Sequence, residues 1–312
     1  MKFFDANYVE QHLSAARCIP LMEQTLKEER TGDCVQYLRT AIDMPNTNIL
    51  GLMPSWFERG YFGAKVISVY HTNGGTGYPS HQGEILLFAG EHGNVLSVTD
   101  AMAVTKIRTG CVSAAASRAL ARPDSKVLAI LGCGAQGHSH MQALSEVFAL
   151  DEVRCWDVHA PSAQTLAEAA RKKGLQSVVC ATAQEAVANA DIICTLTPAK
   201  QPILHHAWIK PGAHINAVGA CAPANRELDS DLMAAARVFC DHRESILKES
   251  GDFLIPMQEG RYGEEHLTGS VGDVLLGKLP GRTAPDEITV FKAVGMAVED
   301  IACAIYLYEQ DN

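Results

Sequence analysis

The sequence predicts an α/β protein, in which a Rossmann-like doubly wound parallel sheet domain is joined to an α+β domain with a mainly antiparallel sheet. Strands and amphipathic helices alternate between about residues 126 and 240, and short apolar runs separated by turns fill residues 35–99. A chain of 312 residues is also too long for one small core. We therefore expect two domains, formed by residues 1–122 with 284–312 and by residues 123–283.

The first domain is expected to begin with a helix and to continue as a sheet. Asp5 can cap a helix over residues 5–30, where apolar residues form an imperfect stripe. The runs ILGLM, AKVISVY, EILLFAG and NVLSVT follow, and turn residues between them, such as NGG at residues 73–75, predict at least one hairpin. An Ala-rich helix should then run from Asp100 to about Ala121.

The second domain should be the parallel sheet. Amphipathic segments at residues 161–173, 183–189 and 227–236 separate its strands. After the Pro/Gly-rich stretch LPGRTAP, we expect residues 287–308 to form one long helix that could pack back on the first domain. The expected strands are KVLAILG, EVRCWD, SVVCA, DIICTLT, HINAVG and RVFCD.

Composition excludes several classes of partner. The net charge of -10 argues against binding to a nucleic acid or an anionic membrane, because both favour a basic face. No apolar run approaches the ~20 residues that span a bilayer, and Asp5 and Glu10 lie where a signal peptide needs an apolar stretch. The ten cysteines form no C-x-x-C pair, so we expect reduced thiols and a cytoplasmic location.

Two pairs of histidines raise the question of a metal site. His138 and His140 form one pair, and His205 and His206 form the other. In neither case does a Cys or carboxylate partner stand at ligand spacing. We therefore expect no metal.

The strongest local motif is GCGAQG at residues 132–137, which fits G-x-G-x-x-G. It follows the expected strand KVLAI and precedes the helical segment SHMQALSEVF. Gly132 permits the tight turn, Gly134 lets the backbone approach a pyrophosphate, and Gly137 lets the helix pack close to the strand. The phosphates of a dinucleotide would then lie at the helix N-terminus.

An acidic residue ends the next expected strand at the distance typical of dinucleotide-binding domains. Asp157 stands about 20 residues after Gly137, and no Arg or Lys follows it directly. A carboxylate there accepts hydrogen bonds from the ribose 2′-OH and repels a 2′-phosphate, so we expect NAD(H) rather than NADP(H). The alternative is a cluster of turn glycines with a surface aspartate. The residues Thr195, Thr197, Val218 and Gly219 fall at the C-terminal ends of two further strands, where ligands of such sheets bind.

Three cations in the first domain stand in otherwise apolar stretches. They are Arg39 in YLRT, Lys65 in GAKVIS and Arg108 in TKIRTG. A buried cation is costly unless an anion pairs with it, and a substrate carboxylate could be that anion. The alternative for each is a side chain that reaches solvent or has a structural partner.

Longer stretches carry a more specific signal than the glycine motif. They are LRTAI, LGLMPSW, FGAKVIS, PSHQGEILLF, KIRTGCVSA, ILGCGAQGHSH, KPGAHINAVGA, RELDSDLM, LKESGD and TVFKAVGMAVED. Through them the chain resembles the ornithine cyclodeaminase/mu-crystallin family over nearly its whole length. That family includes ornithine cyclodeaminases, alanine dehydrogenases and ketimine or pyrroline-2-carboxylate reductases. Its members are typically homodimers joined through the N-terminal sheet domain, so the resemblance implies a homodimer.

The resemblance also implies roles for individual residues. Arg39, Lys65 and Arg108 match positions that hold the substrate carboxylate and line the reacting centre, and it marks Lys65 and Arg108 as catalytic. The positions that match cofactor contacts are Thr109, Ala135, Gln136, Asp157, Thr197, Val218 and Gly219.

Two departures within the family bear on the reaction. Cys221 occupies the position of an Asp that serves as acid/base in cyclodeaminases, and a thiol is a poor substitute for it. The sequence PSHQ at residues 79–82 resembles the ketimine-reductase branch, although Asp157 differs from the NADPH-type strand end of mu-crystallin. Cys221 could be a small apolar neighbour of the nicotinamide or, as an alternative, a redox nucleophile.

These features together predict an NADH-dependent reductase of a small cyclic imino acid, 1-pyrroline-2-carboxylate or 1-piperideine-2-carboxylate. Arg39 and Arg108 would hold the carboxylate, Lys65 would hold it or relay a proton, and His81 is a weaker candidate for that relay. The alternatives are a dehydrogenase acting on an acyclic imino acid to form alanine or aspartate, an ornithine cyclodeaminase, or a non-catalytic binding protein.

Overall fold

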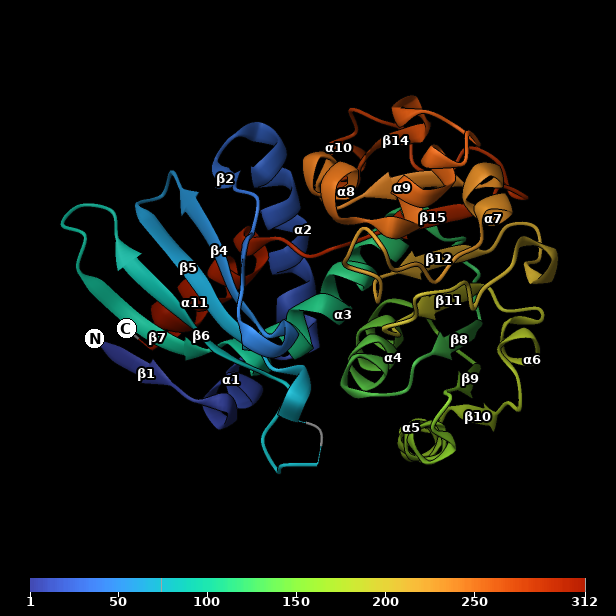
Figure 1. The fold of residues 1–312 in the computed structure, drawn as a ribbon, viewed down its shortest axis with the longest axis horizontal. Coiled ribbons are helices and arrows are strands. Elements are labelled where there is room, and N and C mark those ends of the chain that lie inside the picture. Colours follow the sequence, from blue (N-terminus) through green and yellow to red (C-terminus); the bar gives the residue numbers. More distant parts are fainter. Residues whose placement is uncertain (74, 312) are drawn as a thin grey trace. The chain divides into compact units, whose positions relative to one another are not determined.

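The computed structural model describes residues 1–73 and 75–311, which form two compact units (Figure 1). The first unit contains Met1–Arg108 and Gly295–Asn312, and the second contains Thr109–Val294. The NGG turn expected at residues 73–75 includes Gly74, which lies outside the described residues. None of the helices in the described ranges is both long and apolar enough to cross a membrane.

The first unit is built on a seven-stranded sheet that is antiparallel except at one edge. Strand order is β1-β7-β6-β5-β4-β2, with β3 also paired to β4, and only β1 and β7 run parallel. Because β5 pairs with both β4 and β6 over nine residues, these three strands form its centre. The expected antiparallel sheet is therefore confirmed. The strands are β1 Lys2–Phe4, β2 Cys34–Gln36, β3 Thr40–Asp43, β4 Ile49–Phe57, β5 Tyr61–Val69, β6 His81–Ala89 and β7 Val95–Asp100.

Residues 5–30 were predicted to form one helix, but the structure has two helices there. Asp5 caps α1 (Ala6–His12) as expected, with its carboxylate accepting a hydrogen bond from the amide of Tyr8 at 2.8 Å. The buried Leu13 then leaves the helical region, and the extended Ser14 precedes α2 (Ala15–Thr31). After the break, α2 buries an apolar face that includes Ile19, Met22 and Leu26.

A single C-terminal helix covers one face of this sheet. α11 (Ala297–Gln310) contacts β4, β5 and β6 and packs on α2 (Figure 1). Most of its first nine residues are fully buried, including the acidic pair Glu299 and Asp300 in its first turn. Negative charge at a helix N-terminus is favoured by the helix dipole, but burying two carboxylates requires cationic partners as well.

The second unit is a doubly wound, wholly parallel eight-stranded sheet, as predicted. Its order is β10-β9-β8-β11-β12-β15-β13-β14, so the chain reverses direction across the sheet between β8 and β11. Ligands of such sheets bind at the C-terminal ends of the strands beside this reversal. The strands are β8 Val127–Leu131, β9 Glu152–Trp156, β10 Gln176–Val179, β11 Ile192–Thr195, β12 His214–Ala217, β13 Arg237–Cys240, β14 Leu267–Ser270 and β15 Thr289–Lys292.

Helices flank this sheet, and three of them, α5, α6 and α7, lie in the amphipathic segments of the sequence, whereas α8, α9 and α10 were not predicted. The helix α4 begins directly after the glycine motif, and α5 follows β9. The helices are α4 Ala135–Val147, α5 Ala160–Lys172, α6 Ala183–Val187, α7 Ser230–Ala235, α8 Arg243–Glu249, α9 Gly251–Gln258 and α10 Val271–Leu275.

The prediction of one long helix over residues 287–308 is wrong, because this range contains a strand and a shorter helix. Thr289–Lys292 form β15, which is fully buried between β12 and β13, and α11 begins only at Ala297. Gly295 separates the two elements, with a φ of 85° that favours glycine. Four residues are too few to show strand alternation, and the helical pattern that follows conceals them.

The two units divide the chain at residues 108/109 and 294/295, whereas the sequence predicts 122/123 and 283/284. The helix α3 (Ala101–Leu120) has the bounds expected from its composition, but it begins in one unit and ends in the other. Because the helix is continuous, its sequence contains no local signal of the point at which one unit ends and the other begins. The second boundary moves because β15 belongs to the parallel sheet.

Candidate active site

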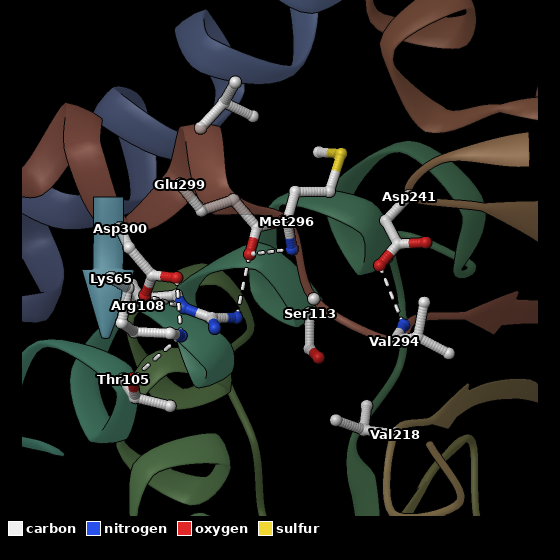
Figure 2. Close-up of polar contacts among 12 residues, drawn as sticks. Lys65, Thr105, Arg108, Ser113, Val218, Asp241, Val294, Met296, Glu299 and Asp300 are labelled. Atoms are coloured by element: carbon white, nitrogen blue, oxygen red, sulfur yellow. Dashed lines mark hydrogen bonds and ion pairs between the residues drawn. The ribbon is translucent and has the colours of Figure 1, made fainter. Parts of the chain in front are cut away.

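Lys65 stands in the middle of β5 on the face that α11 covers. Its ammonium Nζ lies 2.5 Å from Asp300 Oδ2 and 3.4 Å from Thr105 Oγ1 (Figure 2). The side chain is only 3% exposed, and Asp300 is fully buried. An ion pair this deeply buried is held in one geometry.

Arg108, the last residue of the first unit, shares the same acids. Its Nε donates to Asp300 Oδ1 at 3.0 Å, and its Nη1 donates to Glu299 Oε2 at 2.8 Å (Figure 2). The same oxygen of Glu299 also accepts a long hydrogen bond from the amide of Met296 at 3.4 Å. Two carboxylates from the first turn of α11 therefore fix the plane of the Arg108 guanidinium.

Arg39 joins these residues through Gly295. Its Nη2 donates to the Gly295 carbonyl at 3.2 Å. A Cβ at Gly295 would lie 3.3 Å from both terminal nitrogens of Arg108, and the positive φ there is itself unfavourable for other residues. Gly295 thus borders two of the three predicted substrate cations.

The charges of this cluster act on one another. Lys65 and Arg108 form ion pairs with Glu299 and Asp300, and Arg39 donates to the Gly295 carbonyl beside them. Burial lowers the pKa of Lys65 to about 8, with Asp300 opposing that effect and Arg108 and Arg39 adding to it. Although burial alone would raise the pKa of Asp300, Arg108 and Lys65 outweigh it and hold that pKa below its usual value.

Glu299 and Asp300 were not predicted as site residues, although a structural partner for each cation was one of the alternatives considered. Two adjacent acids in the first turn of an otherwise apolar helix were the signal that could have revealed them. His81 is not brought to the cluster within its unit. It is exposed at the start of β6, opposite Val69, four residues along β5 from Lys65 and so roughly 13 Å away.

The glycine loop of the second unit has the shape that a dinucleotide requires. Gly132 has a φ of 99°, and a Cβ there would lie 2.8 Å from the Leu196 carbonyl. A Cβ at Gly137 would lie 2.8 Å from the Gly132 carbonyl, whereas one at Gly134 would meet nothing within 4 Å. The outer two glycines therefore permit close packing, and Gly134 faces the open space that a pyrophosphate would occupy. Ala135 and Gln136 begin α4 beside it, with Ala135 exposed.

Asp157 lies directly after β9 and is tied to the glycine loop. One carboxylate oxygen accepts from the amide of Cys133 at 2.7 Å, and the other accepts from the amide of His159 at 2.8 Å. An open cavity of about 480 Å³ lies beside it. Its lining is mostly apolar and suits a planar base next to a ribose: Trp156, Asp157, Val158, Ala160, Ala163, Val179, Cys180 and Ala181.

The loops after β11 and β12 carry the remaining predicted cofactor residues. Val218 and Gly219 both donate their amides to the Thr195 carbonyl, at 3.0 and 3.1 Å. Thr197, Val218 and Gly219 are partly exposed, but Thr195 is fully buried. Thr195 therefore supports these loops rather than lining a surface. Thr109, which is partly exposed, is the first residue of the second unit and follows Arg108 on α3.

Glu227 is a further residue that the sequence analysis did not single out. Its carboxylate is fully buried and lies between Thr195, Thr197 and Gly219. Burial raises the pKa of Glu227 and the charge of Asp252 adds to that shift, whereas Lys292 and the hydrogen bonds from Thr197 oppose it. The stretch RELDSDLM contains it, but nothing local marks a glutamate as buried.

Cys221 is the one exposed thiol among the ten cysteines, all of which are free. Its Sγ donates to the Val218 carbonyl at 3.2 Å. Within residues 1–73 and 75–311, no group of three or more His, Cys, Asp or Glu side chains could hold a metal ion.

A parallel sheet with this glycine loop at its reversal point, and an acid after the next strand, defines a dinucleotide-binding protein of the Rossmann type. The chain belongs to the ornithine cyclodeaminase/mu-crystallin family, whose model matches residues 2–312. It is 38% identical to ketimine reductase mu-crystallin of Mus musculus over 98% of this chain and 96% of that protein.

Two solved structures extend the similarity. The Δ1-pyrroline-2-carboxylate reductase of Thermococcus litoralis, in complex with NADH and L-proline, is 33% identical with a TM-score of 0.96 over 99% of this chain and 97% of that one. An archaeal alanine dehydrogenase dimer with bound NAD is 29% identical with a TM-score of 0.94 over 98% and 94%. The family and the fold expected from the sequence are both confirmed.

Proposed function

We propose that the protein is an NADH-dependent reductase of a small cyclic imino acid, 1-pyrroline-2-carboxylate or 1-piperideine-2-carboxylate, and forms the L-amino acid. The observation that carries this proposal is the buried cluster in which Glu299 and Asp300 hold Lys65 and Arg108 beside Arg39, because such a cluster presents cations to the carboxylate of the substrate. Relatives named ketimine reductase and Δ1-pyrroline-2-carboxylate reductase support the choice of an imine.

Arg39 and Arg108 would bind the substrate carboxylate. Arg108 is already held by Glu299 and Asp300, so little side-chain entropy is lost when a carboxylate binds to it. Arg39 donates to the carbonyl of Gly295, which borders Arg108, and from there its guanidinium would form a further charge-assisted hydrogen bond with the substrate. The resulting carboxylate binding would orient the imine carbon.

Lys65 would provide the proton. A carbon accepts hydride best when the imine nitrogen is protonated, and an ammonium with a pKa of about 8 is charged at neutral pH yet releases its proton readily. Asp300 keeps that ammonium in place at 2.5 Å. The family aspartate that serves deamination is replaced by Cys221, which favours reduction over cyclodeamination.

The cofactor would lie along the C-terminal edge of the parallel sheet, and its nicotinamide supplies the hydride when bound. The glycine loop would hold the pyrophosphate, and Asp157 would accept hydrogen bonds from the ribose hydroxyls. Asp157 would repel the 2′-phosphate of NADP(H), which is our reason for proposing NADH.

We also propose a homodimer formed through the sheet face opposite α11. There a row of aromatic residues crosses three strands, from Trp56 to Phe62 and Phe88, and the latter two stack with ring centroids 5.0 Å apart. Trp56 is 41% exposed, which is unusual for a large apolar side chain. The similar alanine dehydrogenase is described as a dimer. The ten free thiols support a reducing location, the cytoplasm.

The test is NADH oxidation by the purified protein with a panel of substrates. The panel contains both cyclic imines, and pyruvate or oxaloacetate with ammonia. Ornithine with NAD is tested separately for release of ammonia, because cyclodeamination leaves the amount of NADH unchanged, and such release would make the protein a cyclodeaminase. We expect turnover with a cyclic imine, faster with NADH than with NADPH. Turnover with only a keto acid and ammonia would make the protein an amino-acid dehydrogenase, and NADH binding without any turnover would make it a binding protein.

A further inference from the structure

Glu227 connects the loops that follow two neighbouring strands of the parallel sheet. Its Oε1 accepts from the Thr197 amide at 2.6 Å and from the Thr197 hydroxyl at 2.8 Å. Its Oε2 accepts from the Thr195 hydroxyl and from the Gly219 amide, both at 2.9 Å. One fully buried carboxylate therefore receives four hydrogen bonds from the loops after β11 and β12.

A second buried ion pair holds Glu227 in place. Asp252 Oδ1 accepts from the amides of Glu227 and Leu228, at 2.7 and 3.0 Å. Its other oxygen lies 2.9 Å from Lys292 Nζ, which also donates to the Ala220 carbonyl at 2.8 Å. Residues from α9 and β15 thus fix both the backbone of Glu227 and the loop after β12.

The loops are packed so tightly that Glu227 leaves them no alternative arrangement. A Cβ at Gly219 would overlap the backbone of Thr197 and would lie 2.7 Å from Glu227 Oε1. Since the Thr197 hydroxyl gives its only hydrogen to Glu227 and accepts from the Ala199 amide at 3.3 Å, its oxygen can meet a ligand only as an acceptor.

We propose that Glu227 is a positioning residue for the nicotinamide half of the dinucleotide, and that it fixes Thr197 as an acceptor for a donor group of that half. Such donors are the carboxamide nitrogen and the ribose hydroxyls. The inference rests on the proposed dinucleotide binding. It follows from the two-halved build of such sheets, in which β8 to β10 bind the adenosine half and the strands from β11 onward bind the other half.

A carboxylate is required because all four of its partners are donors. In Glu227→Gln, one oxygen becomes an NH₂ group that would face an amide N–H or a hydroxyl hydrogen. The two hydroxyls could rotate away, but the amides of Thr197 and Gly219 could not. The loop after β11 or the loop after β12 would therefore have to move away from residue 227. In our proposal these loops bind the nicotinamide half of the dinucleotide, so the displacement would affect that half.

The test compares the binding of NADH with that of ADP, which lacks both the nicotinamide and the ribose attached to it, using protein fluorescence and calorimetry. Glu227→Gln should weaken NADH binding about tenfold or more, as expected for a buried donor left without its acceptor, and should change ADP binding less than about twofold. The matched control is Glu244→Gln, an exposed carboxylate on α8, which should change neither affinity.

Equal losses for both ligands, or no loss for NADH, would overturn the proposal. If Glu227→Gln does not fold, Thr197→Val and Thr197→Ser replace it: Val removes the hydroxyl and should weaken NADH only, whereas Ser should retain binding. NADH binding by Thr197→Val at the wild-type level would also overturn the proposal. Failure of the wild-type protein to bind NADH would instead reject the proposed function.

Discussion

Lys65 and Asp300 form a buried ion pair, with Nζ 2.5 Å from Oδ2, between the central strand of the mixed sheet and the first turn of α11. The pair joins residues that are 235 positions apart in the sequence. It places a cation of lowered pKa beside Arg108, which the same carboxylate orients. The chain's own ion pairs therefore hold together the cations of the substrate site that we propose.

Replacing Arg39 with alanine should weaken substrate binding more than it slows the reaction. Arg39 donates to the carbonyl of Gly295 beside Arg108, where its guanidinium would bind the substrate carboxylate that we propose. We expect KM for the imine to rise about tenfold or more with a smaller change in kcat, because a charged hydrogen bond contributes about 1.5–3 kcal/mol. An unchanged kcat/KM would remove Arg39 from the site.

The pH dependence of the reaction should report on Lys65. Burial lowers its pKa to about 8, so the ammonium is charged below this pH and loses its proton above it. We expect kcat/KM for the imine to fall as pH rises through about 8. Lys65→Arg stays charged over this range and should lack that alkaline limb, although its activity should be lower. If kcat/KM of Lys65→Arg falls over the same pH range, the group that titrates is not Lys65.

Removal of the Asp300 charge should destabilise the protein. Asp300→Asn preserves the shape of the side chain but leaves Lys65 and Arg108 buried with one carboxylate fewer. We expect the free energy of unfolding to fall by about 3–5 kcal/mol, measured by denaturant titration. Glu10→Gln, which breaks an exposed ion pair with Lys106, is the control and should cost less than about 1 kcal/mol. Equal effects would show that the buried pair has no special role.

Cofactor preference should depend on Asp157. Asp157→Asn removes the charge that repels a 2′-phosphate but keeps one oxygen to accept from the Cys133 amide. We expect the ratio of kcat/KM for NADPH to that for NADH to rise about tenfold. Asp151→Asn, a change of the same kind at an exposed position, should leave the ratio unchanged. If Asp157→Asn also leaves it unchanged, the basis of the preference lies elsewhere.

Local sequence patterns predicted most of the parallel sheet. The six strands from KVLAILG to RVFCD and the glycine loop have strong local signals, and all are present. β14 and β15 were both missed, because each has only four residues, too few to show strand periodicity. The break at Leu13 and Ser14 was missed because apolar residues continue through it.

The candidate site was predictable in its cations but not in its anions. Arg39, Lys65 and Arg108 stood out as charges in apolar stretches, whereas their partners Glu299 and Asp300 lie at the other end of the chain. Only the fold shows that the two ends meet. Glu227 was missed for the same reason, since its four donors come from two separate loops.

The central claim is that hydride passes from NADH to the carbon of a cyclic imine. The most direct measurement uses NADH that is deuterated at C4 of the nicotinamide on the face that reacts, with 1-pyrroline-2-carboxylate or 1-piperideine-2-carboxylate as substrate. We predict L-proline or L-pipecolate with the deuterium at Cα, detected by NMR and mass spectrometry. Absence of deuterated product from both imines, with a protein that binds NADH, would contradict the account.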